Sequence, residues 1–423
     1  MQAWCRILLP FGLLLSAFAW PSPLKAQSSS VIYDARLASL VADGKTDDAA
    51  ALNRAITSAA TGQYGIVQLP CGQILVQKTI NMTNHSNITL QGCGSNQDYG
   101  GSFPSNSTQI LCDTGTVCLD TTGSSRVTIK DLSLRAANNY KSPSKIGILL
   151  GRDNSGGGGS KNHFCFAQWN LLEHVYIYMD SYPAASPRGR IAVYNVGAEH
   201  FTIKGGKYIA DQALELSEKN ILGASSSYQA LQDGCPASMT IVNVGEGASF
   251  QPWKYFAVEF NDVLDADFAQ VHYICGKPGM IAVNFNSGRI KKISMKGQVE
   301  ECAQFANSNT DLDHDRFDVL VVAPTKTIFV LNQGIKVSSS QFRIAQQNGL
   351  PQLLFNRGSD VTISGSQIDV GTLKGVSSPG IVATGSIVFA PDHHDSDVRF
   401  GPGSHYLLLS DDGISAIGGI RSH

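Results

Sequence analysis

The fold of this chain is indicated by two consecutive stretches, FAVEFNDVLDADFAQV at 256–271 and IAVNFNSGRIKKISMK at 281–296. Each has an apolar strand pattern, a turn containing Asn, and a second apolar strand, and the two copies begin 25 residues apart. Further copies of this frame begin at Cys118, Ile191 and Gln352. A repeat of about 20–50 residues built from short strands is typical of solenoids, in which each unit buries its apolar side against its neighbours. The sequence therefore predicts a coiled stack of strands.

Overlaying the frames also predicts which side chains are neighbours. In the copies that begin at Ile191, Phe256 and Ile281, the second strand places an apolar residue 12 positions later, at Ile203, Phe268 and Ile293. Phe268 should therefore lie next to Ile293. By the same overlay, Asp267 and Lys292 should face each other across adjacent rungs, which are about 4.8 Å apart.

Length and composition fit one long domain. The chain has 423 residues, of which 43% are hydrophobic and 16% charged. Solenoids lengthen without dividing, so we expect a single domain over 27–423, with an N-terminal cap at 27–64 and C-terminal rungs or a cap at 372–423. Residues 1–26 have Arg6, an apolar run and the small residue Ala26, which together predict a cleaved secretory signal, with an uncleaved membrane anchor as the alternative. No other stretch is long enough to span a membrane.

Charge and cysteine content narrow the possible partners and the compartment. Loss of Arg6 and Lys25 with the signal reduces the 32 basic side chains to 30, against 34 acidic ones. This excess of acid argues against a nucleic-acid partner. Eight cysteines remain without Cys5, and an even number in an exported chain predicts disulfides. We expect the pairs Cys275–Cys302, Cys71–Cys93 and Cys112–Cys118, and by elimination Cys165–Cys235. Unpaired buried thiols are the competing interpretation.

One helix is expected, in the region 31–60. Thr46, Asp47 and Asp48 provide capping oxygens and negative charge in front of AAALNRAITSAA at 49–60. Leu52 and Ile56 lie on one side of this helix, together with flanking alanines. Such a helix would cover the apolar end and the unpaired strand edges of the first rung.

The segments DGKTDD (43–48), GIVQLP (65–70) and NITLQG (87–92) resemble the opening of pectate-lyase-like proteins. That superfamily includes polygalacturonases, polysaccharide lyases, epimerases and phage tailspikes. The resemblance implies an all-β, right-handed parallel β-helix with an N-terminal capping helix, a polysaccharide partner and, as in the fibre proteins, a possible homo-oligomer. It covers about residues 33–95. The Gly-His-Gly of polygalacturonases and the Arg-x-Pro-x-x-Arg of calcium pectate lyases are missing, so neither chemistry is implied.

Candidate catalytic residues come from the repeated frames. Hydrolysis of a glycosidic bond needs two carboxylates on either side of it, and Asp265 and Asp267 point to the same side of one strand. A lyase instead needs a base and a cation that neutralises the uronate carboxylate. His272 and Lys292 supply these types, and the expected substrate-binding residues are Arg289, Lys291, Tyr273 and Glu300. Ordinary surface polarity is the competing interpretation for each. Further acids and one histidine nearby are Glu199, His200, Glu259, Asp262 and Glu301.

Other segments suggest cation or sugar binding. The alternating acids of Asp311–Asp315 could hold calcium, although the loop lacks the Gly and closing Glu of a helix–loop–helix site. DHHD at 392–395 could bind a transition metal, or could be a polar loop. No metal ligand is assigned. Aromatic residues that could stack on sugars or pack in the core are Trp169, Tyr176, Tyr178, Tyr182, Trp253 and Tyr255.

These patterns together predict a secreted β-helix that binds an extended polysaccharide along one sheet. We expect cleavage of an acidic, uronate-containing polysaccharide by hydrolysis or β-elimination. The alternative is a non-catalytic, structural or adhesive protein of the cell surface or matrix. Two facing acids without a basic neighbour would favour hydrolysis, whereas Lys or Arg clustered beside an acid would favour elimination.

Overall fold

The computed structural model of the protein describes most of the chain as far as residue 322 and short strands beyond it. The described residues are 31–61, 65–96, 106–151, 169–183, 189–196, 198, 200–217, 241–245, 247–263, 265–275, 280–322, 327–331, 336–338, 340–346, 352–355, 361–364, 367–372, 381–383, 387–389 and 397–400. The expected signal at 1–26, the Cys165–Cys235 pair and the segment 392–395 lie outside these residues.

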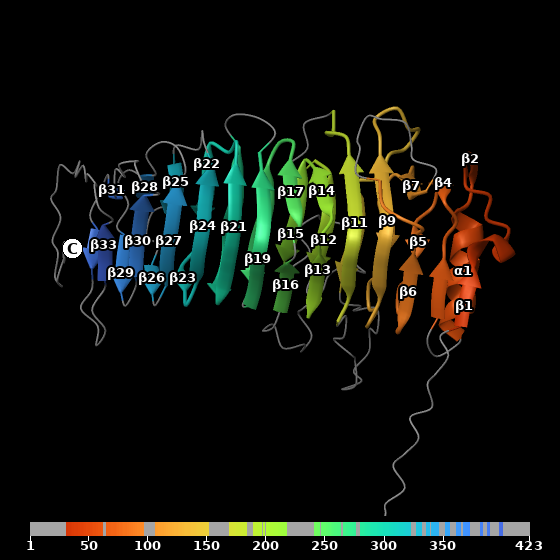
Figure 1. Cartoon of the computed structure of the whole chain (residues 1–423), viewed down its shortest axis with the longest axis horizontal. Coiled ribbons are helices and arrows are strands. Elements are labelled where there is room, and N and C mark those ends of the chain that lie inside the picture. The colour runs from red at the N-terminus through yellow and green to blue at the C-terminus, as the bar shows by residue number, and fades with distance from the viewer. Residues whose placement is uncertain are drawn as a thin grey trace, which may run out of the picture.

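Nearly all described elements are strands, and they form two parallel sheets (Figure 1). The larger sheet, sheet A, has two strips joined by long strands. Its first strip contains β1 (Val31–Asp34), β3 (Gly65–Gln68), β6 (Ile88–Gln91), β9 (Thr128–Ala136), β11 (Leu171–Met179), β13 (Phe201–Lys204), β16 (Ile241–Gly245), β19 (Asp265–Ile274), β21 (Ile293–Glu300), β24 (Arg316–Val322), β27 (Gln341–Gln346), β30 (Gln367–Thr372) and β33 (Asp397–Phe400). The second strip adds β2 (Asp43–Asp47), β4 (Gly72–Val76), β7 (Thr108–Cys112), β14 (Lys207–Ala210) and β17 (Ser249–Pro252).

The second sheet, sheet B, alternates with sheet A along the chain. It contains β5 (Ile80–Asn81), β8 (Val117–Asp120), β10 (Ile146–Gly151), β12 (Ile191–Val196), β15 (Gln212–Ser217), β18 (Phe256–Val263), β20 (Ile281–Lys291), β22 (Gln304–Ser308), β25 (Thr327–Leu331), β28 (Gln352–Phe355) and β31 (Ile381–Ala383). A side strip of β23 (Leu312–Asp313), β26 (Lys336–Ser338), β29 (Val361–Ser364) and β32 (Ile387–Phe389) joins it through β20. This alternation between parallel sheets confirms the predicted β-helix class.

The predicted helix is present at the N-terminal end of the stack (Figure 1). It is α1 (Ala49–Thr61), preceded by the short 3₁₀ helix η1 (Ala35–Ala38). The buried side of α1 includes Leu52 and Ile56, and the helix packs on β1, β3, β5 and β6. The Asp48 carboxylate accepts hydrogen bonds from the backbone N–H groups of Val41 and Ala42, both at 2.9 Å. Asp48 of the DGKTDD segment therefore fixes the chain at 41–42 against the start of α1.

The core is a set of side-chain columns, in which each rung contributes one residue to each column. Strand pairing in sheet A places Val67, Leu90, Ile129, Leu172, Ile203, Val244, Phe268, Met295 and Phe317 in one such column. All nine are almost fully buried. Burial of apolar area in these columns is the main favourable term for folding.

The predicted register is correct in sheet B and wrong in sheet A. Phe256 pairs with Ile281, as the overlay predicted. In sheet A, however, Phe268 pairs with Met295, and Ile293 pairs with Ala266. The shift of two residues arises within β20, where bulges opposite Asn261 and Val263 add residues to the rung. A shift of two preserves which side chains face inward.

Long strands of sheet A bend at a residue with left-handed backbone conformation. Examples are Asp131 in β9 (φ 54°), His174 in β11 (φ 50°) and Gln270 in β19 (φ 56°). In β19, the inward residues are Ala266 and Phe268 before the bend, and those after it are Val271 and Tyr273. The bend therefore resets the alternation of side chains along the strand.

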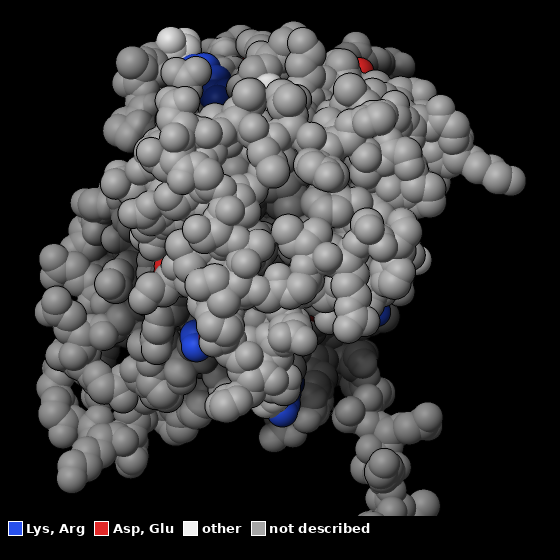
Figure 2. Space-filling model, turned by 90° about the vertical axis from the view of Figure 1, so that its left-hand side faces the viewer, with Lys and Arg blue, Asp and Glu red and all other residues white. Residues whose placement is uncertain are grey.

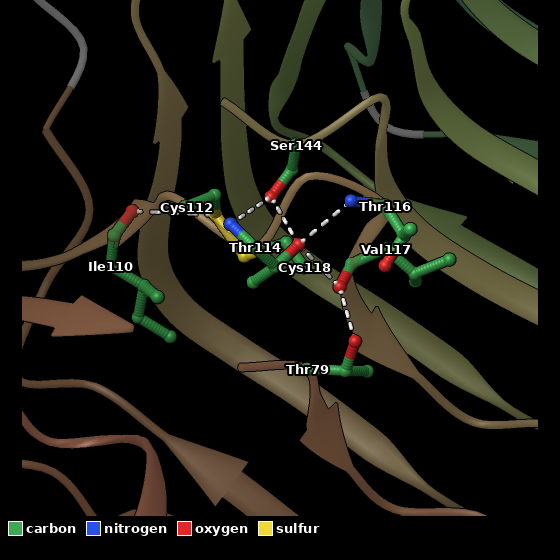
Figure 3. The surroundings of a disulfide bond; sticks show 8 residues. All are labelled: Thr79, Ile110, Cys112, Thr114, Thr116, Val117, Cys118 and Ser144. Carbon is green, nitrogen blue, oxygen red and sulfur yellow. Dashed lines mark hydrogen bonds between the residues drawn. A yellow bond between two sulfur atoms is a disulfide. The ribbon is translucent and has the colours of Figure 1, made fainter. Parts of the chain in front are cut away.

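Three predicted disulfides are present, and each closes a rung or a turn. They are Cys71–Cys93, Cys112–Cys118 and Cys275–Cys302. Figure 3 shows Cys112–Cys118 at the turn between β7 and β8. There the hydroxyls of Thr79 and Thr114 both donate to the carbonyl oxygen of Val117, at 2.8 and 2.9 Å. Covalent and hydrogen bonds thus hold β8 against the preceding rung.

The described helices include none that is long and apolar enough to cross a membrane. Figure 2 looks along the stack from its C-terminal side, where few of the described side chains are visible. Side chains are described most fully in the rungs between β8 and β24, and the candidate site lies in these rungs.

Candidate functional site

Only some of the residues predicted from the frames lie together among the described side chains. Tyr273 is wholly inaccessible to solvent and stacks on Phe250 inside the core, with ring centroids 6.4 Å apart. The prediction that it binds substrate is wrong, because the bend at Gln270 turns Tyr273 inward. His272 lies in β19 after the bend at Gln270, where this long strand continues into the second strip. Its side chain is exposed on the outer face, next to Gln298 of β21.

Asp265, rather than Asp267, is in register with Lys292. Ala266 pairs with Ile293, so the residues immediately before them, Asp265 and Lys292, are neighbours. Burial raises the pKa of Asp265, Lys292 opposes this shift, and Asp267 adds to it. The expected pairing of Asp267 with Lys292 is therefore wrong, and the cause is again the extra residues in β20.

The remaining predicted residues are dispersed. Lys291 forms an ion pair with Asp313 at 2.7 Å. Glu300 accepts a hydrogen bond at 2.6 Å from the side-chain amide of Gln298, and Arg289 lies within β20, where its side chain is outside the description. His272 is not placed beside Lys292, whereas Asp265 lies beside Lys292 and within electrostatic range of Asp267.

The calcium candidate has its carboxylates occupied by protein donors. Asp313 contacts Lys291 and His314, while the Asp315 carboxylate accepts from the backbone N–H groups of Ile293 at 2.8 Å and of Asp313 at 3.0 Å. Burial raises the pKa of Asp315 well above its usual value. Within the described ranges, no group of three or more His, Cys, Asp or Glu side chains is arranged to hold a metal ion.

A different pair of acids does lie together, on the outer face of sheet B. Glu215 of β15 pairs in register with Glu259 of β18. The side-chain amide nitrogen of Gln212 lies 3.2 Å from Oε2 of Glu215 and 3.0 Å from Oε2 of Glu259. The two oxygens can be no farther apart than the sum of these distances. Gln212 therefore connects two carboxylates on adjacent rungs.

Strand alternation explains why both acids face outward. Leu214 and Leu216 of β15, and Val258 and Phe260 of β18, belong to the main core. In the column that contains Glu215 and Glu259, Asp120 of β8 is followed by Leu149 and Tyr194, which belong to a separate apolar cluster on the other face of the sheet. Along this face the surface changes from apolar at β10 and β12 to acidic at β15 and β18.

Beyond the acids the same column continues with amides. Asn284 of β20 follows Glu259, and Asn307 of β22 follows Asn284. The Asn307 side chain donates to Oδ1 of Asn284 at 3.0 Å. Asn261, two residues after Glu259, accepts from Asn286 and Ser287 at 2.9 Å each. Its own Nδ2 is buried and has no hydrogen-bond partner among the described residues.

This arrangement has the parts that acid catalysis at a glycosidic bond requires. Two carboxylates on adjacent rungs can divide into a proton donor and a nucleophile or base, because repulsion between like charges favours retention of one proton. The largest possible distance between Oε2 of Glu215 and Oε2 of Glu259, set by their contacts with Gln212, is below the ~6.5–9.5 Å that separates the carboxyl groups of inverting hydrolases. It is closer to the ~5–5.5 Å of retaining enzymes. The facing parts of β15, β18, β20 and β22 (QALELS, AVEFN, AVNFN and QFANS) contain no Lys or Arg.

The sequence contains a pattern that indicates the pair of Glu215 and Glu259, but this pattern lies partly outside the five frames that were compared. Glu259 was among the further acids, but Glu215 was missed. The segment QALEL, which begins at Gln212, matches the starts of the frames at Ile191 (IAVYN), Phe256 (FAVEF) and Ile281 (IAVNF). Aligned in this way, the fourth position is Tyr194, Glu215, Glu259 and Asn284, which is the column found in the structure.

Comparison with known proteins agrees with this architecture. The model of the family described as "Rhamnogalacturonase A/epimerase, pectate lyase-like" matches residues 35–221. No curated protein matches the chain. Solved structures with a similar arrangement include ORF18 of Geobacillus virus E2, at 14% identity and a TM-score of 0.46, which covers 90% of this chain and 61% of that one.

Two further structures are of enzymes. The A-module of the mannuronan C-5 epimerase AlgE4 from Azotobacter vinelandii is 13% identical, with a TM-score of 0.47 and coverage of 92% of this chain and 99% of that one. The catalytic unit of a GH87 α-1,3-glucanase from Streptomyces thermodiastaticus is 11% identical, with a TM-score of 0.48 and coverage of 91% and 70%. The family match over residues 35–221 and the stack of parallel rungs fit the pectate-lyase-like β-helix superfamily.

Proposed function

We propose that this protein is a secreted polysaccharide hydrolase in which Glu215 and Glu259 act on the glycosidic bond. The observation that supports this proposal most directly is the Gln212 amide that contacts both carboxylates. One carboxyl group would protonate the oxygen of the leaving sugar, and the other would attack the anomeric carbon. Water would then release the covalently bound sugar, with the first group acting as base.

Burial supports a chemical role for these acids. Glu215 has no solvent-accessible surface and Glu259 is 5% exposed. In such an environment, the field of a carboxylate is far stronger than in water, which favours stabilisation of a positively charged sugar in the transition state. A substrate can reach Glu215 only when the outer face of sheet B is uncovered, so binding and exposure of the pair must be coupled.

The proposed substrate is an acidic, uronate-containing polysaccharide. The family that matches residues 35–221 carries the name of a rhamnogalacturonase, and that name refers to a polymer that contains rhamnose and galacturonic acid. Three disulfides suit an oxidising compartment outside the cytoplasm, where such polymers occur.

A panel of acidic and neutral polysaccharides tests the proposal. The expected result is new reducing ends without a rise in ultraviolet absorbance, since β-elimination would create an absorbing double bond. Glu215→Gln and Glu259→Gln should each lower the rate by about 10²–10⁴-fold. The control is Asp318→Asn, which removes a carboxylate from the outer face of sheet A.

The outcomes separate the alternatives. A rise in absorbance would assign the protein to the lyases and contradict hydrolysis. Full activity in both glutamine variants would remove the acid pair from the mechanism. Binding without cleavage of any polymer would favour the non-catalytic, adhesive alternative.

A further inference from the structure

The turns from sheet B into sheet A place one left-handed residue at the same position in several rungs. Thr89, Thr128, Leu171 and Thr202 are in register across four rungs of sheet A. Two positions before them lie Asn87, Arg126, Trp169 and His200, with φ of 58°, 56°, 56° and 52°. Because this conformation is repeated, the corner side chains lie above one another at the rung spacing.

Three of these side chains form a stack, which we call the corner stack: Arg126, Trp169 and His200. The Arg126 guanidinium carbon lies 5.3 Å from the centre of the Trp169 ring. The Trp169 and His200 rings are nearly parallel, at 19°, with centroids also 5.3 Å apart. Trp169 is thus flanked on both sides, while half of its surface (51%) remains exposed.

The fold itself does not require this stack. In the described chain, the other large apolar side chains with comparable exposure are Ile32, Leu37 and Val41, all in the N-terminal cap. Trp169 contributes nothing to the buried columns, and a bulky residue is unfavourable in left-handed backbone. Asn87 shows that a small amide satisfies the same corner position.

Arg126 is an exposed cation whose plane is fixed. Contact with the Trp169 ring orients the guanidinium, and no ion pair to a carboxylate is found for it among the described residues. A planar guanidinium held in this way keeps its N–H edges free for a carboxylate, which it can bind with two parallel hydrogen bonds. Lys130 and Lys204 lie in register on either side of Glu173, four residues after the corner in each strand, and the Asp265 carboxylate is within electrostatic range of His200.

We propose that the corner stack is a binding site for the carboxylate groups of an acidic polysaccharide that lies along the axis of the stack. The inference rests on the proposed function, because it names the same class of substrate. The three rungs of the corner stack directly precede the rungs of β15 and β18, which carry the acid pair. A polymer held at the corner would therefore extend toward Glu215 and Glu259.

The test is affinity electrophoresis in gels that contain polygalacturonate, or the same polymer after reduction of its carboxyl groups. Wild type should be retarded by polygalacturonate only, and added salt should weaken the retardation. Arg126→Gln and Trp169→Asn should each bind about tenfold more weakly. Asparagine is chosen at position 169 because Asn87 occupies the equivalent corner, so the variant should keep or raise the thermal midpoint.

Controls separate this site from other cations and from catalysis. Lys45→Ala and Leu37→Ala, both in the N-terminal cap, should bind as wild type does. Glu215→Gln should retain full binding even when cleavage is lost, so failure of the hydrolase proposal leaves this one open to measurement. Equal retardation of wild type and both corner variants, equal retardation by the reduced polymer, or no retardation of wild type would each overturn the inference.

Discussion

Replacement of Tyr273 by Phe should stabilise the protein although it removes a polar group from the core. The Tyr273 side chain is wholly buried, and its hydroxyl has no hydrogen-bond partner among the described residues. An unsatisfied buried hydroxyl costs about 1–3 kcal/mol, whereas Phe keeps the ring and its stacking on Phe250. We therefore expect Tyr273→Phe to raise the free energy of unfolding by about 1–2 kcal/mol at neutral pH.

The same variant should change how stability depends on pH. Burial raises the pKa of Tyr273 well above its usual value, so the folded state keeps the proton while the unfolded chain loses it near pH 10. Stability is therefore fully present below pH 10 and decreases above it. The slope for one such group is about 1.4 kcal/mol per pH unit. Tyr273→Phe removes this decrease, so its advantage over wild type should grow between pH 10 and 11.

Urea unfolding followed by circular dichroism at pH 7, 10 and 11 measures both effects. Tyr208→Phe should behave in the same way, because Tyr208 is also buried and its hydroxyl has no hydrogen-bond partner in the part of the chain that the structure describes. Tyr33→Phe, at a partly exposed position in β1, is the control and should change little. Destabilisation of Tyr273→Phe by 1 kcal/mol or more would refute the reasoning, because it would mean that the hydroxyl has a favourable partner.

Three further changes test the packing of the stack. Phe268→Ala should lower the free energy of unfolding by about 3–5 kcal/mol, since Phe268 is fully buried and contacts the Phe260 ring at 5.6 Å; a loss below 1 kcal/mol in urea unfolding would contradict this packing. Replacing both Cys275 and Cys302 by Ala should cost about 2–4 kcal/mol in the same assay, and an equal midpoint for the oxidised wild type and the variant would argue against the bond. Gly297→Ala should lower the thermal midpoint, because a Cβ there would lie 2.1 Å from the carbonyl oxygen of Val271; an unchanged midpoint would show that the backbone can yield.

The sequence was sufficient for those features that repeat strictly. The overlay of the frames at Phe256 and Ile281 gave the correct pairing in sheet B, because equal spacing along the chain becomes direct contact in a stack. The same logic placed Cys275 beside Cys302, and capping chemistry located the start of α1 at Ala49. Each of these depends on local patterns that a single sequence displays.

Features that depend on an irregular residue were not predictable in this way. Bulges in β20 shifted the following register by two, which moved Lys292 from Asp267 to Asp265. A left-handed residue at Gln270, which carries no sequence signal such as Gly or Asn, turned Tyr273 into the core. Glu215 was missed for a different reason, because its rung begins with Gln rather than with an apolar residue.

The shared conformation of the corner residues has a consequence for how such a protein can change. A side chain at a corner can be exchanged while the buried columns of the same rung stay as they are. Insertion of one complete winding between β12 and β15 would move the corner stack away from the acid pair by a single step of about 4.8 Å. The distance between the corner stack, which would bind the polymer, and the acid pair, which would cleave it, could therefore change only by whole windings.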